Sequence, residues 1–202
     1  MGHRTLGASR RSFLKGSAAA AAFSIVPRHV LGGPGFVAPS ERVAVAVVGA
    51  GGMGMRDTQS LLGEPEAQVV AVCDVAERTD LRGFWYRCEA GRRPVKELVE
   101  AHYGKETPNY RCAEHEDFRV MLEQQKGIDA VLCATPDHLH AYVSIAAMRL
   151  GKHVYCEKPL AHSVWEVRRM AQVARETGVA TQMGVQGHSG SAIRMTCEWI
   201  WD

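Results

Sequence analysis

The sequence lacks the features that mark several large classes of protein. No apolar run approaches the roughly 20 residues that a membrane-spanning helix needs. The net charge is only +2, and the Lys and Arg residues are dispersed, so nothing indicates a groove for nucleic acid. The six cysteines contain no C-x-x-C pair. With 46% hydrophobic and 23% charged residues, the 202-residue chain is long enough for one well-cored globular domain, or for one domain and a fragment.

The cysteines are distributed along the whole chain, at positions 73, 88, 112, 133, 156 and 197. Cys73, Cys133 and Cys156 fall in predicted buried strands, where cysteine behaves as a small hydrophobic residue. Disulfides are the alternative, because the sequence cannot fix the geometry that a bridge requires.

The first forty residues are typical of an export signal. Ser9–Lys15, SRRSFLK, resembles a twin-arginine signal, and the weakly apolar residues 16–26 and a Gly/Pro linker follow it. The apolar stretch is too short to span a bilayer and has the charged flank of a signal. No clean A-x-A cleavage site follows, and a disordered basic tail is the alternative. We expect export by the twin-arginine route to the periplasm or another extracytoplasmic place, without a stable membrane anchor.

The most informative motif in the rest of the chain is a glycine-rich loop. The apolar run 43–48 predicts a strand buried on both faces, and Gly49, Gly51 and Gly54 follow it in the spacing G-x-G-x-x-G. In dinucleotide-binding folds these glycines allow a tight turn, close approach of the backbone to a pyrophosphate, and close packing of the next helix. Asp74 ends the next predicted strand, 20 residues after Gly54, where a carboxylate can accept from a ribose 2′-OH. A βα turn without a ligand is the alternative.

Strands and helices alternate from residue 41 onward, which predicts an α/β fold with a doubly wound parallel sheet. We expect six strands, at residues 43–48, 69–73, 109–112, 129–134, 153–156 and 179–183. Ser163 and Glu166 form a capping box for the helix that ends at Gly178. Residues 81–93 are the least readable segment, because their sequence predicts no clear secondary structure. Ligands bind such sheets outside the carboxyl ends of the strands. The loops expected at that edge are 49–54, 135–140, 157–159 and 184–188, together with Asp74.

Four motifs together resemble the Gfo/Idh/MocA oxidoreductases, over roughly residues 41–202. They are the glycine loop, ATPDHLHA at 134–141, GKHVYCEKPLA at 151–161 and TQMGVQGHSG at 181–190. The Glu-Lys-Pro element is the most specific of them. The resemblance implies a Rossmann NAD(P)-binding fold and the interconversion of a hydroxyl and a carbonyl group on a sugar or polyol. It implies a nicotinamide cofactor held by Gly49, Gly51, Gly52, Met53, Gly54, Asp74, Thr135, Pro136, His138, His140, Glu157 and Lys158.

Lys158 is the catalytic candidate that the resemblance implies. A fixed cation stabilises the charge that hydride transfer leaves on the substrate oxygen, and Pro159 restricts the residue before it. A solvated loop lysine is the alternative. Asp74 favours NAD over NADP because a carboxylate repels a 2′-phosphate, although the nearby Arg78 leaves NADP open. We expect no metal, since His138, His140 and His153 lack a clearly placed third carboxylate or cysteine. His188 is expected on the loop surface or near the nicotinamide.

The resemblance also implies a second α/β domain, which would carry most of the sugar pocket, the acid/base histidine and the oligomer interface. We find no counterpart for it in the sequence and expect residues 1–40 to be signal and linker, 41–187 the Rossmann domain, and 188–202 the start of a linking helix. An inactive nucleotide-binding fragment, or a Rossmann domain for another adenosyl ligand, is therefore an alternative. The resemblance implies a polar residue at position 185, where this sequence has Val185, and this departure weakens any role for the loop. Trp199–Trp201 are expected to belong to an ordinary core helix.

Overall fold

The structure, a computed structural model, describes residues 37–202. The export signal predicted at Ser9–Lys15 lies outside these residues. Residues Glu41–Asp202 form one compact unit. A short 3₁₀ turn, η1 (Pro39–Glu41), ends at its first residue. None of the described helices combines the length and the apolar character needed to cross a membrane.

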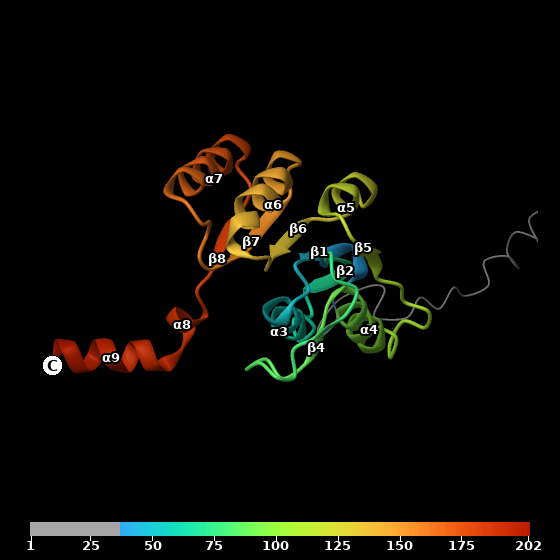
Figure 1. Cartoon of the computed structure of the whole chain (residues 1–202), viewed down its shortest axis with the longest axis horizontal. Helices are drawn as coiled ribbons and strands as arrows, with labels where there is room; N and C mark the ends of the chain where they lie inside the picture. The colour runs from blue at the N-terminus through green and yellow to red at the C-terminus, as the bar shows by residue number, and fades with distance from the viewer. Residues whose placement is uncertain (1–36) are drawn as a thin grey trace, which may run out of the picture. The chain divides into compact units, whose positions relative to one another are not determined.

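A single six-stranded sheet forms the centre of this unit (Figure 1). Its spatial order is β5-β2-β1-β6-β7-β8, and every neighbouring pair is parallel. The strands are β1 (Val43–Val48), β2 (Ala67–Cys73), β5 (Ala113–His115), β6 (Ala130–Cys133), β7 (His153–Glu157) and β8 (Thr181–Gly184). The order reverses between β1 and β6, which creates the crevice where doubly wound sheets bind ligands. The predicted fold class is confirmed.

Helices cover both faces of the sheet, with α3 and α4 on one side and α5, α6 and α7 on the other (Figure 1). They are α3 (Gly52–Leu61), α4 (Arg92–Tyr103), α5 (Phe118–Gln124), α6 (Asp137–Arg149) and α7 (Val164–Thr177). Two buried apolar clusters result, one for each face. Met121, Val143 and Met148 belong to one cluster, and Val95 and Val99 belong to the other.

Local signals in the sequence set the ends of several helices. The Ser163 hydroxyl accepts from the Glu166 N–H at 3.3 Å and donates to the Glu166 carboxylate at 2.9 Å. Ser163 and Glu166 thus cap α7 as a pair, although the carboxylate accepts from the hydroxyl and not from the Ser163 backbone N–H of a complete capping box. Gly178 ends the same helix in the left-handed region, with φ of 67°.

Two segments differ from the prediction. The strand expected at 109–112 forms instead at Ala113–His115, because Asn109 adopts a left-handed turn with φ of 65°. Residues 79–90, within and around the least readable segment, form a small antiparallel hairpin of β3 (Thr79–Asp80) and β4 (Glu89–Ala90). The Gly91 N–H donates to the Ala50 carbonyl at 2.6 Å, which attaches the hairpin to the glycine-rich loop.

The last two helices, α8 (Gln186–Ser189) and α9 (Ser191–Trp201), follow β8. Neither contains a buried residue, and Trp199, Ile200 and Trp201 are 75%, 74% and 82% exposed. The expectation of an ordinary core helix is therefore wrong for α9 within the described part of the chain.

Candidate active site

The glycine-rich loop joins β1 to α3 in a close-packed turn. Gly49 has φ of 89°, and a Cβ placed there would lie 2.5 Å from the Thr135 nitrogen. A Cβ on Gly54 would lie 1.9 Å from the Gly49 carbonyl oxygen, so only glycine allows α3 to begin this close to the strand. A Cβ on Gly51 would meet nothing within 4 Å. The loop is therefore tight on its inner side and open at Gly51, the position where the backbone must approach a pyrophosphate.

The other two loop residues differ in their surroundings. A Cβ on Gly52 would lie 2.3 Å from the ring of Tyr86, a residue of the segment between β3 and β4. Met53 is half-buried in the first turn of α3. The role expected for both residues in binding stays a prediction.

Asp74 holds the loop in place through its carboxylate. One oxygen accepts from the Ala50 N–H at 2.7 Å and the other accepts from the Ala76 N–H at 2.8 Å. Carboxylate oxygens have about four lone-pair sites in total, so acceptor capacity remains for a ligand hydroxyl. Asp74 thus joins the end of β2 to the glycine loop, in addition to the ribose contact that the sequence predicts.

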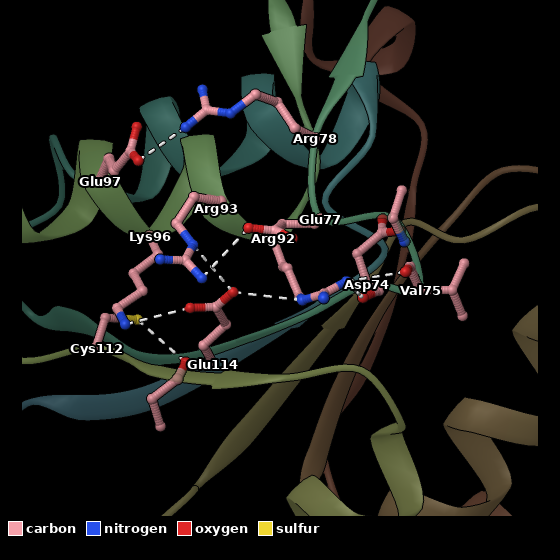
Figure 2. A network of polar contacts seen from close by, with 12 residues as sticks. Asp74, Val75, Glu77, Arg78, Arg92, Arg93, Lys96, Glu97, Cys112 and Glu114 are labelled. Atoms are coloured by element: carbon pink, nitrogen blue, oxygen red, sulfur yellow. Dashed lines mark hydrogen bonds and ion pairs between the residues drawn. The ribbon is translucent and has the colours of Figure 1, made fainter.

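A network of charged side chains supports the Asp74 turn from the side of α4 (Figure 2). Arg92 donates to the Val75 carbonyl at 2.8 Å and to the Asp74 carbonyl at 3.2 Å. Figure 2 also shows Arg92, Arg93 and Lys96 converging on Glu114 of β5, each at 3.3 Å. The Arg92 and Glu114 side chains are only 16% and 15% exposed, so this part of the network is shielded from solvent.

The Arg78 side chain forms ion pairs with two carboxylates. Its guanidinium pairs with Glu97 at 2.9 Å and with Glu89 at 3.2 Å. An arginine free to meet a 2′-phosphate would favour NADP. The Arg78, Glu89 and Glu97 side chains are 46%, 43% and 56% exposed, and ion pairs this exposed are weak, so Arg78 still leaves NADP open.

A cavity of about 510 Å³ opens beside Asp74, at the carboxyl ends of β1, β2 and β6. Four of the predicted cofactor residues line it, namely Gly49, Asp74, Thr135 and Pro136. Phe118 and Leu139 add apolar surface to the same cavity. Glu116, Asp117 and Arg119 also line it, so the cavity combines several charged groups with an apolar wall.

The two histidines of the 135–140 segment lie in different surroundings. His138 is exposed, and its Nδ1 lies 3.9 Å from the Asp137 carboxylate. His140 is only 2% exposed, and its ring nitrogens lie 2.7 Å from the carbonyl oxygens of Thr135 and Pro159. Both ring nitrogens thus face carbonyl oxygens of the protein, and a neutral imidazole donates at only one of its nitrogens. The buried ring is enclosed between the two loops, which gives His140 a positioning role, and its contact with the cofactor stays a prediction.

Glu157 and Lys158 extend the site to the end of β7. Glu157 is only 4% exposed, and one of its carboxylate oxygens accepts from the Gln186 amide while the other is buried without a hydrogen-bond partner among the described residues. Lys158 is exposed, and residues 37–202 offer its ammonium no hydrogen bond or ion pair. The loop thus holds one anchored acid beside one available cation.

Three residues beside Glu157 were not singled out by the sequence reasoning, although the loop 184–188 was expected at this edge. Asp57 of α3, Tyr155 of β7 and Gln186 of α8 surround it: the Gln186 amide also contacts the Tyr155 hydroxyl at 3.4 Å. Burial, followed by the nearby charge of Glu157, raises the pKa of Asp57 to about 7. For Asp57, the sequence showed only an acidic residue in the first half of a helix that packs against the sheet. It could not show that Glu157 lies nearby.

The raised pKa of Asp57 predicts an unusual dependence of stability on pH. Between about pH 4 and about pH 7 the folded protein binds more protons at Asp57 than the unfolded chain does, so stability falls as pH rises through this range. Because the group is partly exposed, we expect a loss of about 1–2 kcal/mol rather than the full value of the shift. Urea unfolding at about pH 5 and about pH 8 measures the difference in the free energy of unfolding between the two pH values, and Asp57→Asn should remove the decline. An unchanged slope in the variant would contradict the assignment.

The structure does not assemble the three histidines considered as a metal site. His153 is exposed, and its Nδ1 accepts from the Ala180 N–H at 3.0 Å. His188 lies on the exposed helix α8. The described residues instead bring His140 together with Cys133 and Cys156, with ligand atoms within 4.8 Å of one another.

Comparisons with known proteins agree with this geometry. A family model for Gfo/Idh/MocA proteins, described as an oxidoreductase family with an NAD-binding Rossmann fold, matches residues 43–185. A glycosyl hydrolase family 109 protein from Stenotrophomonas maltophilia (strain K279a) is 34% identical over 148 residues, which cover 73% of this chain and 29% of that protein. Inositol 2-dehydrogenase 1 from Saccharopolyspora erythraea is 34% identical over 147 residues, which cover 72% of this chain and 36% of that protein. The chain thus spans well under half the length of these relatives.

Solved structures share the fold. Scyllo-inositol dehydrogenase from Lactobacillus casei, solved with bound NAD(H) and scyllo-inositol, gives a TM-score of 0.61 at 20% identity and covers 79% of this chain and 41% of its own. KijD10, a 3-ketoreductase from Actinomadura kijaniata solved with TDP-benzene and NADP, gives a TM-score of 0.60 at 24% identity. The match covers 79% of this chain and 43% of KijD10. At these identities the likeness shows the fold alone.

Proposed function

The chain belongs to the Gfo/Idh/MocA oxidoreductase family, and from this premise we propose that it is the nucleotide-binding part of an NAD-dependent enzyme that oxidises or reduces a sugar or polyol by hydride transfer. The observation that carries the proposal is the meeting, at one edge of the sheet, of three elements. They are the glycine loop that is open at Gly51, the loop-bound Asp74, and the exposed Lys158. Relatives named for inositol and levoglucosan dehydrogenase activity support the substrate class.

The residues present fit a nicotinamide dinucleotide. The open space at Gly51 and the first N–H groups of α3 would hold the pyrophosphate, since a helix N-terminus attracts anions. The spare lone pairs of Asp74 would accept from the adenosine ribose, and Thr135 and Pro136 would line the cavity that it enters. The buried, unpartnered oxygen of Glu157 supplies one further acceptor near the end of β7.

The bound nicotinamide would supply the hydride chemistry. Lys158 would place its ammonium beside the substrate oxygen and stabilise the negative charge that develops there. The Gln186–Glu157 contact fixes the start of this loop, and Pro159 restricts the backbone of Lys158. His140 holds the Pro159 carbonyl, so the lysine stands on a supported segment.

Export by the twin-arginine route is also part of the proposal and is supported by the pattern at Ser9–Lys15. A catalytically inactive nucleotide-binding chain is the second candidate. A homo-oligomer is expected only if a second domain completes the protein.

Lys158→Ala tests the proposed catalytic role. In the full chain, we expect NADH formation with a responsive sugar or polyol to fall by about 10²-fold or more, because the variant loses a charge that acts on the transition state. NADH affinity should change little. The assay follows NADH absorbance over a panel of sugars and polyols. Glycosides are tested in a second assay that measures the released sugar, because cleavage of a glycosidic bond forms no net NADH.

Lys152→Ala is the matched control, because Lys152 precedes the same strand at the opposite edge of the sheet. Equal losses in the two variants would argue against a specific role for Lys158. NADH binding by the wild type without turnover on any substrate would instead favour the inactive nucleotide-binding chain.

A further inference from the structure

Two cysteines lie side by side beneath the candidate active site. Cys133 and Cys156 are register partners at the ends of β6 and β7, so their side chains point to the same face of the sheet. They are 0% and 1% exposed. Their sulfurs lie within 4.8 Å of each other and of a His140 ring nitrogen. The proposed hydride chemistry uses neither thiol.

The spacing is compatible with a disulfide. Neighbouring strands lie about 4.8 Å apart, and disulfides join residues whose Cα atoms are about 4.4–6.8 Å apart. The Cβ atoms of a bridged pair lie only about 3.8 Å apart, so closing the bridge draws the two strand ends together. Those ends lead directly into Thr135 and into the Glu157–Pro159 loop.

The two thiols differ in reactivity. The Cys133 sulfur lies 3.5 Å from the Thr135 hydroxyl. Hydrogen bonding from the Cys156 thiol lowers the pKa of Cys133 to about 7, and the same contact raises the pKa of Cys156. Burial raises the pKa of both Cys73 and Cys112 to about 12. Cys133 therefore has the lower pKa of the two thiols, whereas Cys156 is the one of the pair that lines the cavity described next.

A cavity of about 270 Å³ reaches Cys156 from between α6, α7 and β8. Ser144 lines it with a buried hydroxyl that has no hydrogen-bond partner within the described residues. The cavity exceeds the volume of a water molecule many times, so it has room for a small polar oxidant such as hydrogen peroxide.

We propose that Cys133 and Cys156 form a reversible disulfide when the protein meets a hydroperoxide, and that this bridge loosens the cofactor site above it. The thiolate of one cysteine attacks one peroxide oxygen, which gives a sulfenic acid and releases hydroxide. The thiol of the other cysteine then attacks the oxidised sulfur, and a water molecule leaves. The two thiols lose two electrons and two protons, and the peroxide is reduced to two molecules of water.

The contacts of His140 favour this chemistry over metal binding. A metal at Cys133, His140 and Cys156 would need a free ring nitrogen. Both nitrogens of His140 are already 2.7 Å from carbonyl oxygens, so coordination would break one of the contacts that hold the site loops.

Intact mass spectrometry of the full chain after hydrogen peroxide treatment tests the proposal. We expect the mass to fall by two hydrogen atoms, a non-reducing peptide map to join Cys133 to Cys156, and dithiothreitol to reverse both changes. The bridged protein should bind NADH roughly tenfold more weakly. This last expectation rests on the proposed function, whereas the mass and the peptide map do not.

Three variants provide controls. A variant with both Cys73→Ser and Cys112→Ser should still form the bridge. Cys133→Ser and Cys156→Ser should each lose it, and dimedone should trap a sulfenic acid on the remaining cysteine of the pair in at least one of them. No mass loss in the folded wild type, a bridge between other cysteines, or one tightly bound zinc per chain would overturn the proposal. Unchanged NADH affinity in the bridged protein would overturn its effect on the site.

Discussion

Gly54→Ala should destabilise the protein by about 3 kcal/mol or more. The added Cβ would lie 1.9 Å from the Gly49 carbonyl oxygen and 2.9 Å from the carbonyl carbon. Both are backbone atoms of the β1–α3 turn, and Gly49 is itself held in the left-handed region, so neither can move without opening the turn. Urea unfolding of the full chain measures the loss.

Gly51→Ala is the matched control in the same loop. Its added Cβ meets nothing within 4 Å, so the free energy of unfolding should change by no more than about 1 kcal/mol. The methyl group would nevertheless occupy the space that a pyrophosphate needs, so NADH binding should be lost from a folded protein. Equal destabilisation by both substitutions would contradict the division of the loop into a packed side and an open side.

His140→Ala should cost about 3–5 kcal/mol and loosen both loops of the site. The substitution leaves a cavity in place of a side chain that is 2% exposed, and it removes the partner of the Thr135 and Pro159 carbonyls. We also expect faster amide hydrogen exchange at 157–160, because the segment loses its tie to α6. Urea unfolding and hydrogen exchange measured by mass spectrometry check the two effects.

His153→Ala provides the comparison for His140. His153 is exposed and accepts one hydrogen bond from the Ala180 N–H, so its replacement should cost about 1 kcal/mol or less. Similar losses for the two histidines, or unchanged exchange at 157–160 in His140→Ala, would show that His140 does not position the loops.

Local patterns predicted the framework of the fold. The apolar run at 43–48, the glycine spacing after it and the helix cap at Ser163 each depend on residues close in sequence, and each forms as expected. The strand expected at 109–112 was misplaced because a left-handed Asn109 extends the turn before it. A turn of this kind leaves little trace in a hydrophobic pattern.

Contacts between distant segments could not be predicted. Asp57 and Glu157 are a hundred positions apart, and only the crossing of α3 over the sheet brings their charges together. The buried position of His140 depends on the Pro159 carbonyl, and the pairing of Cys133 with Cys156 depends on strand register. A sequence gives residue types and local spacing, but register and helix placement decide which side chains meet.

Titration of NADH into the full chain, with NADPH in parallel, tests the central claim most directly. We predict saturable NADH binding with a micromolar Kd and weaker NADPH binding, since the Asp74 carboxylate repels a 2′-phosphate. Binding should be lost in Gly51→Ala and weakened in Asp74→Ala, with circular dichroism unchanged in Gly51→Ala. A folded wild type that shows no saturable NADH binding, or a Gly51→Ala variant that binds NADH as the wild type does, would contradict the account.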